Sequence, residues 1–398
     1  MNNDSKRFNI NYYLVIGAYI GLFYFGLIDN GRGPAYPSII KDLNLTNWGG
    51  SLFFAFSSLM SFITTILSSF WLKKLKLMQG MKVSWLFLSL SAFCLGLCGL
   101  WESQTLLYLA SIIQGVGMGI TGMNMNLMIE AGAPSLYRRR FFGGLHATYG
   151  IASFSAPLLF TISRNFKLVW EEYFFLLGSI GITLLFFFPL FFTTSNGDKF
   201  SYEEPKDETI PISFLYLLAI SLCVGMYVAS EIVVSSRLVL FLETLHSMPN
   251  NQANLYLSSF FILLMIGRLM LGFINIPMRS QSLLVLSLLL TSAFCFFGKD
   301  YPIFLSLSGL TMSVFFPSFM DWIAEAFPNN FQRVMRFAMA GIGAHLVLMH
   351  LSFGRIADSL GIEKAMNLPF ILSFISLLLL LISLLNHRRI TKKMRDLQ

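Results

Sequence analysis

Two carboxylates lie inside apolar stretches of the chain that are long enough to cross a membrane. Asp29 belongs to the apolar stretch that begins at residue 12, and Glu231 lies deep in the one that begins at residue 210. A charged side chain at the centre of a bilayer costs about 3 kcal/mol on insertion scales, so it normally faces a water-filled cavity or a partner. We therefore predict that Asp29 and Glu231 line a central cavity, where one of them carries a proton.

A purely structural explanation stays open for each carboxylate. Arg32 follows Asp29 by three residues on the same helix face, so the two side chains can form a local ion pair near the outer mouth of the helix. For Glu231 the alternative is a structural salt bridge. Arg237 lies six residues further on and does not share this face, so we expect any partner of Arg237 across the helix bundle.

Uncharged polar side chains within the apolar stretches indicate where a hydrophilic solute binds. These side chains need hydrogen bonds in lipid surroundings, and a sugar-like ligand supplies them. The predicted substrate-binding residues are Asn30, Gln114, Asn126, His146, Tyr149 and Tyr227, of which Asn30 and Tyr149 are implied by the family resemblance described below. A lone buried histidine is often only hydrogen-bonded, so that explanation stays open for His146. Asn126 also ends a stripe with Gly115, Gly119 and Gly122, and close helix packing by itself explains these glycines.

Charged side chains gather at the ends of the expected helices on one side of the membrane. The gate candidates are Glu130, Arg138, Arg268, Asp321, Arg333 and Arg336. Pairs between such residues form an inner gate in an outward-open state and break when two halves rock. Membrane topology and helix capping are the alternative explanation. Residues 354–361 are expected to act similarly at the opposite side.

The composition shows what must position these groups. Of 398 residues, 55% are apolar and 12% charged, whereas soluble domains carry about 25% charged residues. The mean hydropathy is +0.67. A soluble enzyme, a nucleic-acid binder and a disordered protein are excluded. A membrane helix needs about 20 apolar residues, and twelve stretches qualify: 12–33, 51–72, 82–101, 105–130, 141–163, 172–193, 210–241, 252–274, 282–298, 301–324, 337–357 and 366–386.

The basic residues between these stretches predict the orientation. With a cytoplasmic N-terminus, nineteen of the 28 Lys and Arg residues fall on the cytoplasmic side and seven on the other, while Arg237 and Arg268 lie within spans. This bias places both termini in the cytoplasm. The net charge of +8 thus reflects topology, and no nucleic-acid partner is expected. We expect a multi-pass protein of the plasma (bacterial inner) membrane, with its first span retained rather than cleaved as a signal peptide.

A polar stretch divides the chain into two halves. Residues 195–209 are rich in acidic residues and lack apolar periodicity, which is typical of a linker. The predicted domains are a six-helix bundle at 1–194 and a second at 210–398 that ends in a basic cytoplasmic tail. The fold class is therefore an all-α membrane protein with two pseudo-symmetric bundles of six helices. Similar helix exits at 130–134 and 325–328 support a repeat of this kind.

This layout resembles the major facilitator superfamily, and three patches are similar to its branch of fucose–proton symporters and sugar permeases. The patches are residues 26–53, with Asn30, Gly33 and Pro34; residues 115–126; and Tyr227-Val228-Ala229-Ser230-Glu231. The resemblance implies twelve helices, alternating access, a sugar-like solute and proton symport. Two features depart from the pattern. Lys73 and Lys74 stand where the superfamily has an Asp-Arg signature, and Gly122 stands where that branch has a helix 4 carboxylate.

The leading functional hypothesis is a secondary transporter that moves a small hydrophilic solute, with protons as the coupled ion. A drug or lipid exporter of the same fold is the alternative, and a polytopic membrane enzyme is a remote one, so no enzymatic activity is predicted. No phosphate-binding loop is present, so gradients rather than ATP must drive transport. Cys94, Cys98, Cys223 and Cys295 show no disulfide or zinc spacing. We expect no cofactor and no metal, and we expect a monomer in the lipid bilayer.

Overall fold

The computed structural model describes residues 10–134, 138–191, 212–273, 277–327 and 331–395. In this part of the chain all regular structure is helical, and twelve helical segments are long and apolar enough to cross a membrane. The expected fold class is confirmed. The long helices of the first half are α1 (Tyr12–Asp42), α2 (Asn47–Ile66), α4 (Leu77–Leu100), α5 (Gln104–Gly132), α6 (Arg138–Asn165) and α7 (Trp170–Phe191), with a short α3 (Ser68–Trp71).

The second half begins after the predicted linker 195–209, which lies outside the described residues. Its helices are α8 (Phe214–Leu245), α9 (Asn250–Phe273), α10 (Ser280–Phe297), α11 (Ile303–Ser313), α12 (Phe315–Ala326), α13 (Phe331–Leu360), α14 (Ile362–Ala365) and α15 (Leu368–Arg395). One cluster of buried apolar side chains lies almost wholly within α1–α7, and another lies within α8–α15. Each half therefore has a core of its own.

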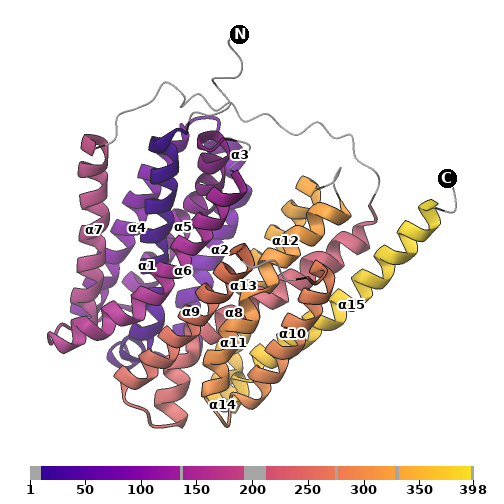
Figure 1. Ribbon diagram of the computed structural model, residues 1–398. Helices are drawn as coiled ribbons and strands as arrows, with labels where there is room; N and C mark the ends of the chain where they lie inside the picture. The colour runs from indigo at the N-terminus through magenta and orange to yellow at the C-terminus, as the bar shows by residue number, and fades with distance from the viewer. Residues whose placement is uncertain (1–9, 135–137, 192–211, 274–276, 328–330, 396–398) are drawn as a thin grey trace.

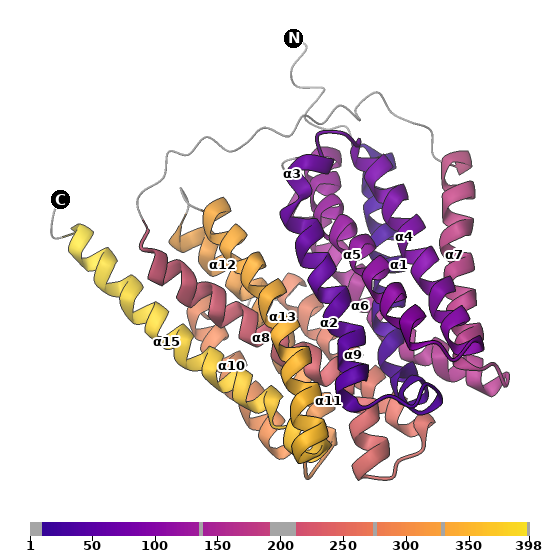
Figure 2. The same cartoon turned by 180° about the vertical axis from the view of Figure 1, so that it is seen from behind.

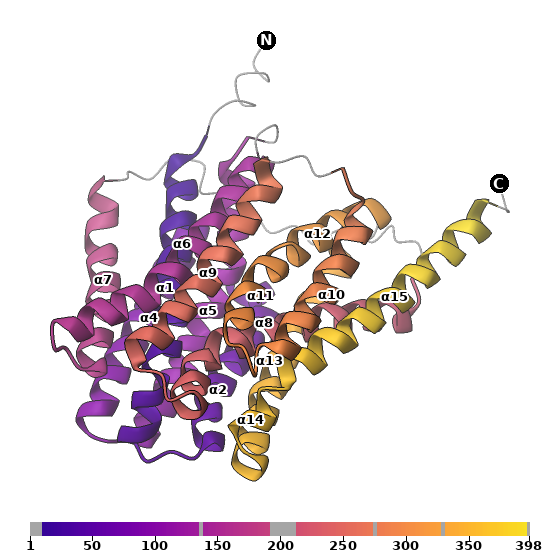
Figure 3. The ribbon, with the colours of Figure 1, turned by 60° about the horizontal axis from the view of Figure 1, so that its bottom comes forward.

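The two halves lie side by side and touch through three pairs of helices, α1 with α8, α2 with α13, and α6 with α9. Figure 1 shows α1, α4 and α7 upright and α10 and α15 inclined against them. We call the end where Tyr12 begins α1 the near end, and the end where Asp42 finishes it the far end. The reverse view in Figure 2 also shows α15 leaning away from the first half toward the near end. Figure 3 brings the far end forward and shows α9 beside α6.

Several helix boundaries differ from those expected from the sequence, and two of the differences bear on the candidate site. α1 was expected to end near residue 33 but continues through Pro34 and Pro37 to Asp42, because a proline in a membrane helix removes only one backbone hydrogen bond that its neighbours replace. Asp29 therefore lies in the middle of α1 and not at its exit. The tenth span, expected as one helix, is divided at Val314 into α11 and α12. Pro317 explains this break, because its ring clashes with the carbonyl four residues earlier.

The glycine stripe of α5 has two different environments. A Cβ atom on Gly115 would meet the carbonyl of Ser57 and would lie 2.7 Å from the Cβ of Met60, both in α2. A Cβ on Gly119 would lie 2.7 Å from the carbonyl of Ser61. Nothing lies within 4 Å of the corresponding position on Gly122. Close packing therefore explains Gly115 and Gly119 but not Gly122, which borders open space.

Replacing Gly115 with alanine is expected to destabilise the protein, because the added methyl group forces α2 and α5 apart, and overpacking of this kind costs about 1–3 kcal/mol. The matched control is Gly122→Ala, on the same face of the same helix, where the methyl group meets no atom. Thermal unfolding of the purified protein in detergent measures both variants. Equal melting temperatures for the two variants would contradict the proposed packing.

Candidate functional site

Glu231 lies at the middle of α8 in a group of side chains from the second half. The Tyr227 hydroxyl lies 2.7 Å from Oε2 of Glu231, and Nη2 of Arg268, in α9, lies 3.3 Å from Oε1. The same hydroxyl lies 2.5 Å from the carbonyl oxygen of Met312, in α11. Only 14% of the Glu231 side chain is exposed. The structural salt bridge foreseen as an alternative therefore exists, and its partner is Arg268.

The Tyr227 hydroxyl has one hydrogen and two oxygen neighbours. When Glu231 is ionised, both neighbours are acceptors, so the hydroxyl can fully satisfy only one of them. When Glu231 is protonated, its own O–H donates to the Tyr227 oxygen, and Tyr227 donates to the Met312 carbonyl. The charged form has Arg268 as its partner, and the neutral form has a complete set of hydrogen bonds. The geometry thus accommodates Glu231 in both protonation states.

Asp29 forms the local ion pair with Arg32 that was the alternative to a cavity role. Nη1 of Arg32 donates to the Ser57 hydroxyl at 2.7 Å, and Nε donates to the backbone carbonyl of Asp29 at 3.3 Å. Arg32 is buried, and 14% of the Asp29 side chain is exposed. Asp29 and Arg32 both lie on α1, and the bond from Arg32 to Ser57 connects the pair to α2. All three residues belong to the first half.

Tyr149 of α6 lies beside Asn30 and Asp29 of α1. Nδ2 of Asn30 donates to the Tyr149 hydroxyl at 3.2 Å and to the Ser153 hydroxyl at 2.9 Å, and the Tyr149 hydroxyl is 3.5 Å from Oδ2 of Asp29. The next residue on α6 is Gly150, and a Cβ there would lie 3.0 Å from the side chain of Met265 on α9. This part of α6 therefore lies where the two halves meet.

The other predicted substrate-binding residues differ in accessibility. Asn126 is exposed, and its Nδ2 donates to the carbonyl of Gly122, one helical turn earlier. His146 is partly buried, and its ring lies 6.3 Å from that of Phe316 in the other half. Gln114 is completely buried, and neither of its polar atoms has a hydrogen-bond partner among the described residues. In this conformation Gln114 is therefore not available to a solute.

Glu130, Arg268 and Asp321, the predicted gate residues whose side chains the structure describes, form no ion pair between the halves at the near end. Glu130 and Asp321 are exposed, and Asp321 accepts a hydrogen bond of 2.5 Å from Ser280 of its own half. Arg268 binds Glu231 instead. Within the side chains that the structure describes, no ion pair joins the two halves at this end. The side chains of Arg138, Arg333 and Arg336 lie outside the described set.

The far end is held by a contact within the expected segment 354–361. Oδ1 and Oδ2 of Asp358, in α13, accept hydrogen bonds of 2.8 Å from the backbone N–H groups of Asn47 and Trp48. These groups form the first turn of α2, where an anion is favoured by free N–H groups and the helix dipole. A Cβ on Gly354 would lie 2.6 Å from the Cβ of Ser51, so α13 rests directly on α2.

Arg237, for which the sequence predicted a partner across the bundle, also joins the halves near this end. It is completely buried, and its Nη2 donates to the Ser51 hydroxyl at 3.2 Å. The rings of Tyr36 and Phe54 each lie 4.3 Å from its Cζ. The partner expected across the bundle is thus a set of aromatic rings and not a carboxylate.

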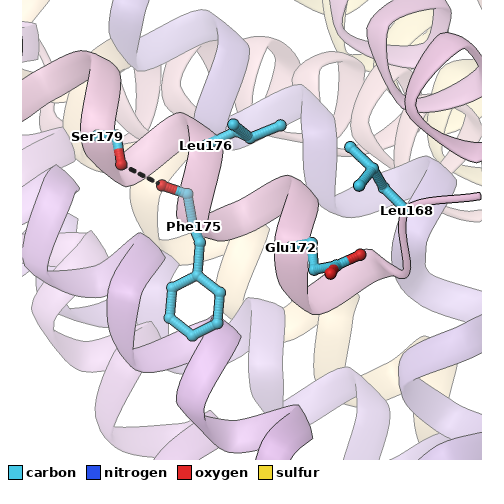
Figure 4. A pocket seen from close by; sticks show the side chains of 5 residues that line it. All are labelled: Leu168, Glu172, Phe175, Leu176 and Ser179. Carbon is cyan, nitrogen blue, oxygen red and sulfur yellow. Dashed lines mark hydrogen bonds between the residues drawn. The ribbon is translucent and has the colours of Figure 1, made fainter. Parts of the chain in front are cut away.

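A separate depression of about 250 Å³ lies at the far end of α7. Figure 4 shows the side chains that line it: Leu168, Glu172, Phe175, Leu176 and Ser179. It contains none of the predicted site residues. Among the described residues, no three His, Cys, Asp or Glu side chains are grouped so that they can hold a metal ion.

Comparisons with known proteins identify the fold. A family model described as Major Facilitator Superfamily matches residues 18–335. No curated protein matches the chain. A bacterial homologue of the human lysosomal transporter Spinster, inward-facing and occupied, has a TM-score of 0.68 and 12% identity over 94% of this chain and 97% of that one. The transporter FucP, in an outward conformation, has a TM-score of 0.61 and 15% identity over 94% and 99%. At these identities the two structures show the fold alone.

Replacing Asp358 with alanine is expected to favour opening at the far end, because the first turn of α2 loses both acceptors. Loss of a capping acceptor costs about 1 kcal/mol, so the equilibrium should shift roughly fivefold. Spin labels at the exposed positions Lys41 and Lys364 report the distance between the halves at this end. Asp300→Ala removes the same charge at an exposed far-end position and is the control. Identical distance distributions for both variants would show that Asp358 does not hold the far end.

Proposed function

This chain belongs to the major facilitator superfamily, and we propose that it is a secondary active transporter of a small hydrophilic, sugar-like solute, with protons as the coupled ion. The observation that carries this proposal is the position of Glu231, a mid-membrane carboxylate whose surroundings suit both its charged and its neutral form. Such a group can bind a proton in one conformation and release it in another.

The contacts between the halves support alternating access. Asp358 and the first turn of α2 hold the far end together. At the near end the described gate carboxylates, Glu130 and Asp321, are exposed. We infer that this conformation is the one open toward the near end. Rocking of the halves about α1–α8, α2–α13 and α6–α9 then opens the far end.

The orientation in the membrane follows from the distribution of basic residues. The loops at the near end carry most of the Lys and Arg residues, so we propose that this end faces the cytoplasm and that the protein lies in the plasma (bacterial inner) membrane. The conformation described here is then inward-facing. In this orientation protons and solute enter at the far end and leave at the near end.

Hydrogen-bonding groups near the meeting of the halves support a polar solute. Asn30, Tyr149 and Ser153 form one connected group beside Asp29. Asn126 is exposed next to the open position at Gly122. These amide and hydroxyl groups both donate and accept hydrogen bonds, which suits a ligand rich in hydroxyl groups. We propose that Asn30, Asn126, His146 and Tyr149 contact the solute, whereas Tyr227, which is completely buried, positions Glu231.

Replacing Glu231 with glutamine is expected to abolish proton-coupled transport and leave the protein folded, because the amide keeps the shape of the side chain but cannot be ionised at any working pH. Proteoliposomes with an internal pH dye measure proton entry as each of a panel of sugars is added outside. Glu243→Gln is the matched control, because Glu243 lies on the same helix and bonds only to Asn250 among the described residues.

Proton entry that persists in Glu231→Gln would remove Glu231 from the mechanism. Solute entry in the wild-type protein that requires Na⁺ and moves no protons would show that the coupled ion is wrong. A melting temperature close to that of the wild-type protein is needed to attribute lost transport to the missing charge.

A further inference from the structure

A buried cation without an anionic partner lies between the two halves near the far end. Arg237 of α8 has no exposed surface and no ion pair with any described carboxylate. Its guanidinium is surrounded by Tyr36 of α1, Phe54 of α2 and Phe353 of α13, with Cζ-to-ring distances of 4.3, 4.3 and 5.0 Å. Rings stabilise a desolvated cation through their negative faces, so the stack explains how Arg237 is tolerated here.

The stack leaves several buried polar atoms without partners. Nε and Nη1 of Arg237 and Nδ1 of His350 have no hydrogen-bond partner among the described residues. The Tyr36 hydroxyl lies beside Arg237 and Ser51 but forms no well-aligned hydrogen bond with either of them. The His350 ring is stacked on Phe54 at 5.2 Å, so these atoms belong to one cluster. A cluster that only joined the halves could use apolar atoms in their place, since an unpartnered buried donor is destabilising.

A second guanidinium adds to the positive charge of this cluster. Arg32 lies on the same Phe54 ring as Arg237, with its Cζ 4.9 Å from the ring centre. Asp29 neutralises Arg32. Asp358, the carboxylate of the far-end contact, already accepts hydrogen bonds from two backbone N–H groups of α2. One positive charge therefore remains unbalanced.

Opening of the far end separates the parts of this cluster. Tyr36, Ser51 and Phe54 belong to the first half, whereas Arg237, His350 and Phe353 belong to the second. When the halves move apart, Arg237 loses the Ser51 hydrogen bond and two of its three rings. An exposed guanidinium in a cleft is an efficient ligand for a carboxylate or phosphate, which it binds through two parallel N–H bonds.

We propose that Arg237, with Arg32, Tyr36 and His350, binds a carboxylate or phosphate group of the transported solute when the far end is open. This inference rests on the proposed transport function and narrows the solute to an anionic one, such as a sugar acid or sugar phosphate. The anion supplies the missing negative charge between Arg32 and Arg237. Its departure at the near end lets the rings close on Arg237 again.

Ligand-dependent melting of the purified full-length protein tests the proposal without any transport step. The soluble probes are glucuronate against glucose and glucose 6-phosphate against glucose. An anionic and a zwitterionic lysophospholipid form a second arm, which separates a lipid headgroup from a soluble anion. We expect stabilisation by the anionic member of a pair only, with affinity at least tenfold lower in Arg237→Gln. Arg164→Gln removes an exposed positive charge at the far end and is the control.

A second variant covers the case in which Arg237→Gln does not fold. Tyr36→Phe keeps the ring that stacks on Arg237 and removes only the hydroxyl. A solely structural cluster predicts that this variant is as stable as the wild-type protein and unchanged in every other respect. The proposed site predicts the same stability without ligand, together with several-fold weaker binding of the anionic probe.

Three results would overturn the anionic site: equal stabilisation by the neutral probes, anion binding that Tyr36→Phe leaves unchanged, and no stabilisation by any anion. Stabilisation by a neutral sugar, with proton entry lost in Glu231→Gln, would retain the transport function while refuting the anionic site. Anion binding that is not accompanied by proton entry would retain the anionic site and refute proton-coupled transport.

Discussion

The free-energy cost of placing a charged side chain in an apolar helix bundle is the main constraint on this structure. The charged groups within the spans are accommodated in two ways: Asp29 pairs with Arg32 and Glu231 pairs with Arg268, whereas Arg237 stacks on aromatic rings. The two ion pairs are each confined to one half, so rocking of the halves leaves both intact. The Arg237 stack and the Asp358 contact span the boundary, and they are therefore sensitive to the conformational state.

The sequence predicted the helices and their grouping well, because membrane helices are identified by length and apolar composition alone. It predicted pairing less well. Arg32 was found as the partner of Asp29 because both lie on one helix face. Arg268 was assigned to the gate from its place toward a helix end, because its pairing with Glu231 on a different helix cannot be read from spacing along the chain. The end of α1 was wrong because prolines that stop soluble helices are tolerated in membrane helices. The sequence could not distinguish Gly122 from Gly115, because both belong to one helical stripe. They differ only in what lies next to them: α2 packs against Gly115, and nothing packs against Gly122.

The two ends of the molecule are held by different chemistry. At the far end, Asp358 uses backbone N–H groups of α2, which are present whatever side chains occupy Asn47 and Trp48. The sequence predicted that the segment 354–361 acts at this end, but it did not predict the partner of Asp358. Every residue type except proline carries a backbone N–H, so a partner of this kind cannot be recognised from side chains. At the near end the predicted gate consists of charged side chains. Two of its carboxylates, Glu130 and Asp321, are exposed in this conformation.

The hydroxyl of Tyr227 contacts a carboxylate of its own helix, α8, and a backbone carbonyl of a second helix, α11. Its single hydrogen points either to Glu231 or to the carbonyl of Met312, just before the chain breaks between α11 and α12. In the proposed proton coupling, protonation of Glu231 turns that hydrogen toward Met312, and loss of the proton turns it back. The divided tenth span is thus placed to respond to the protonation state of Glu231.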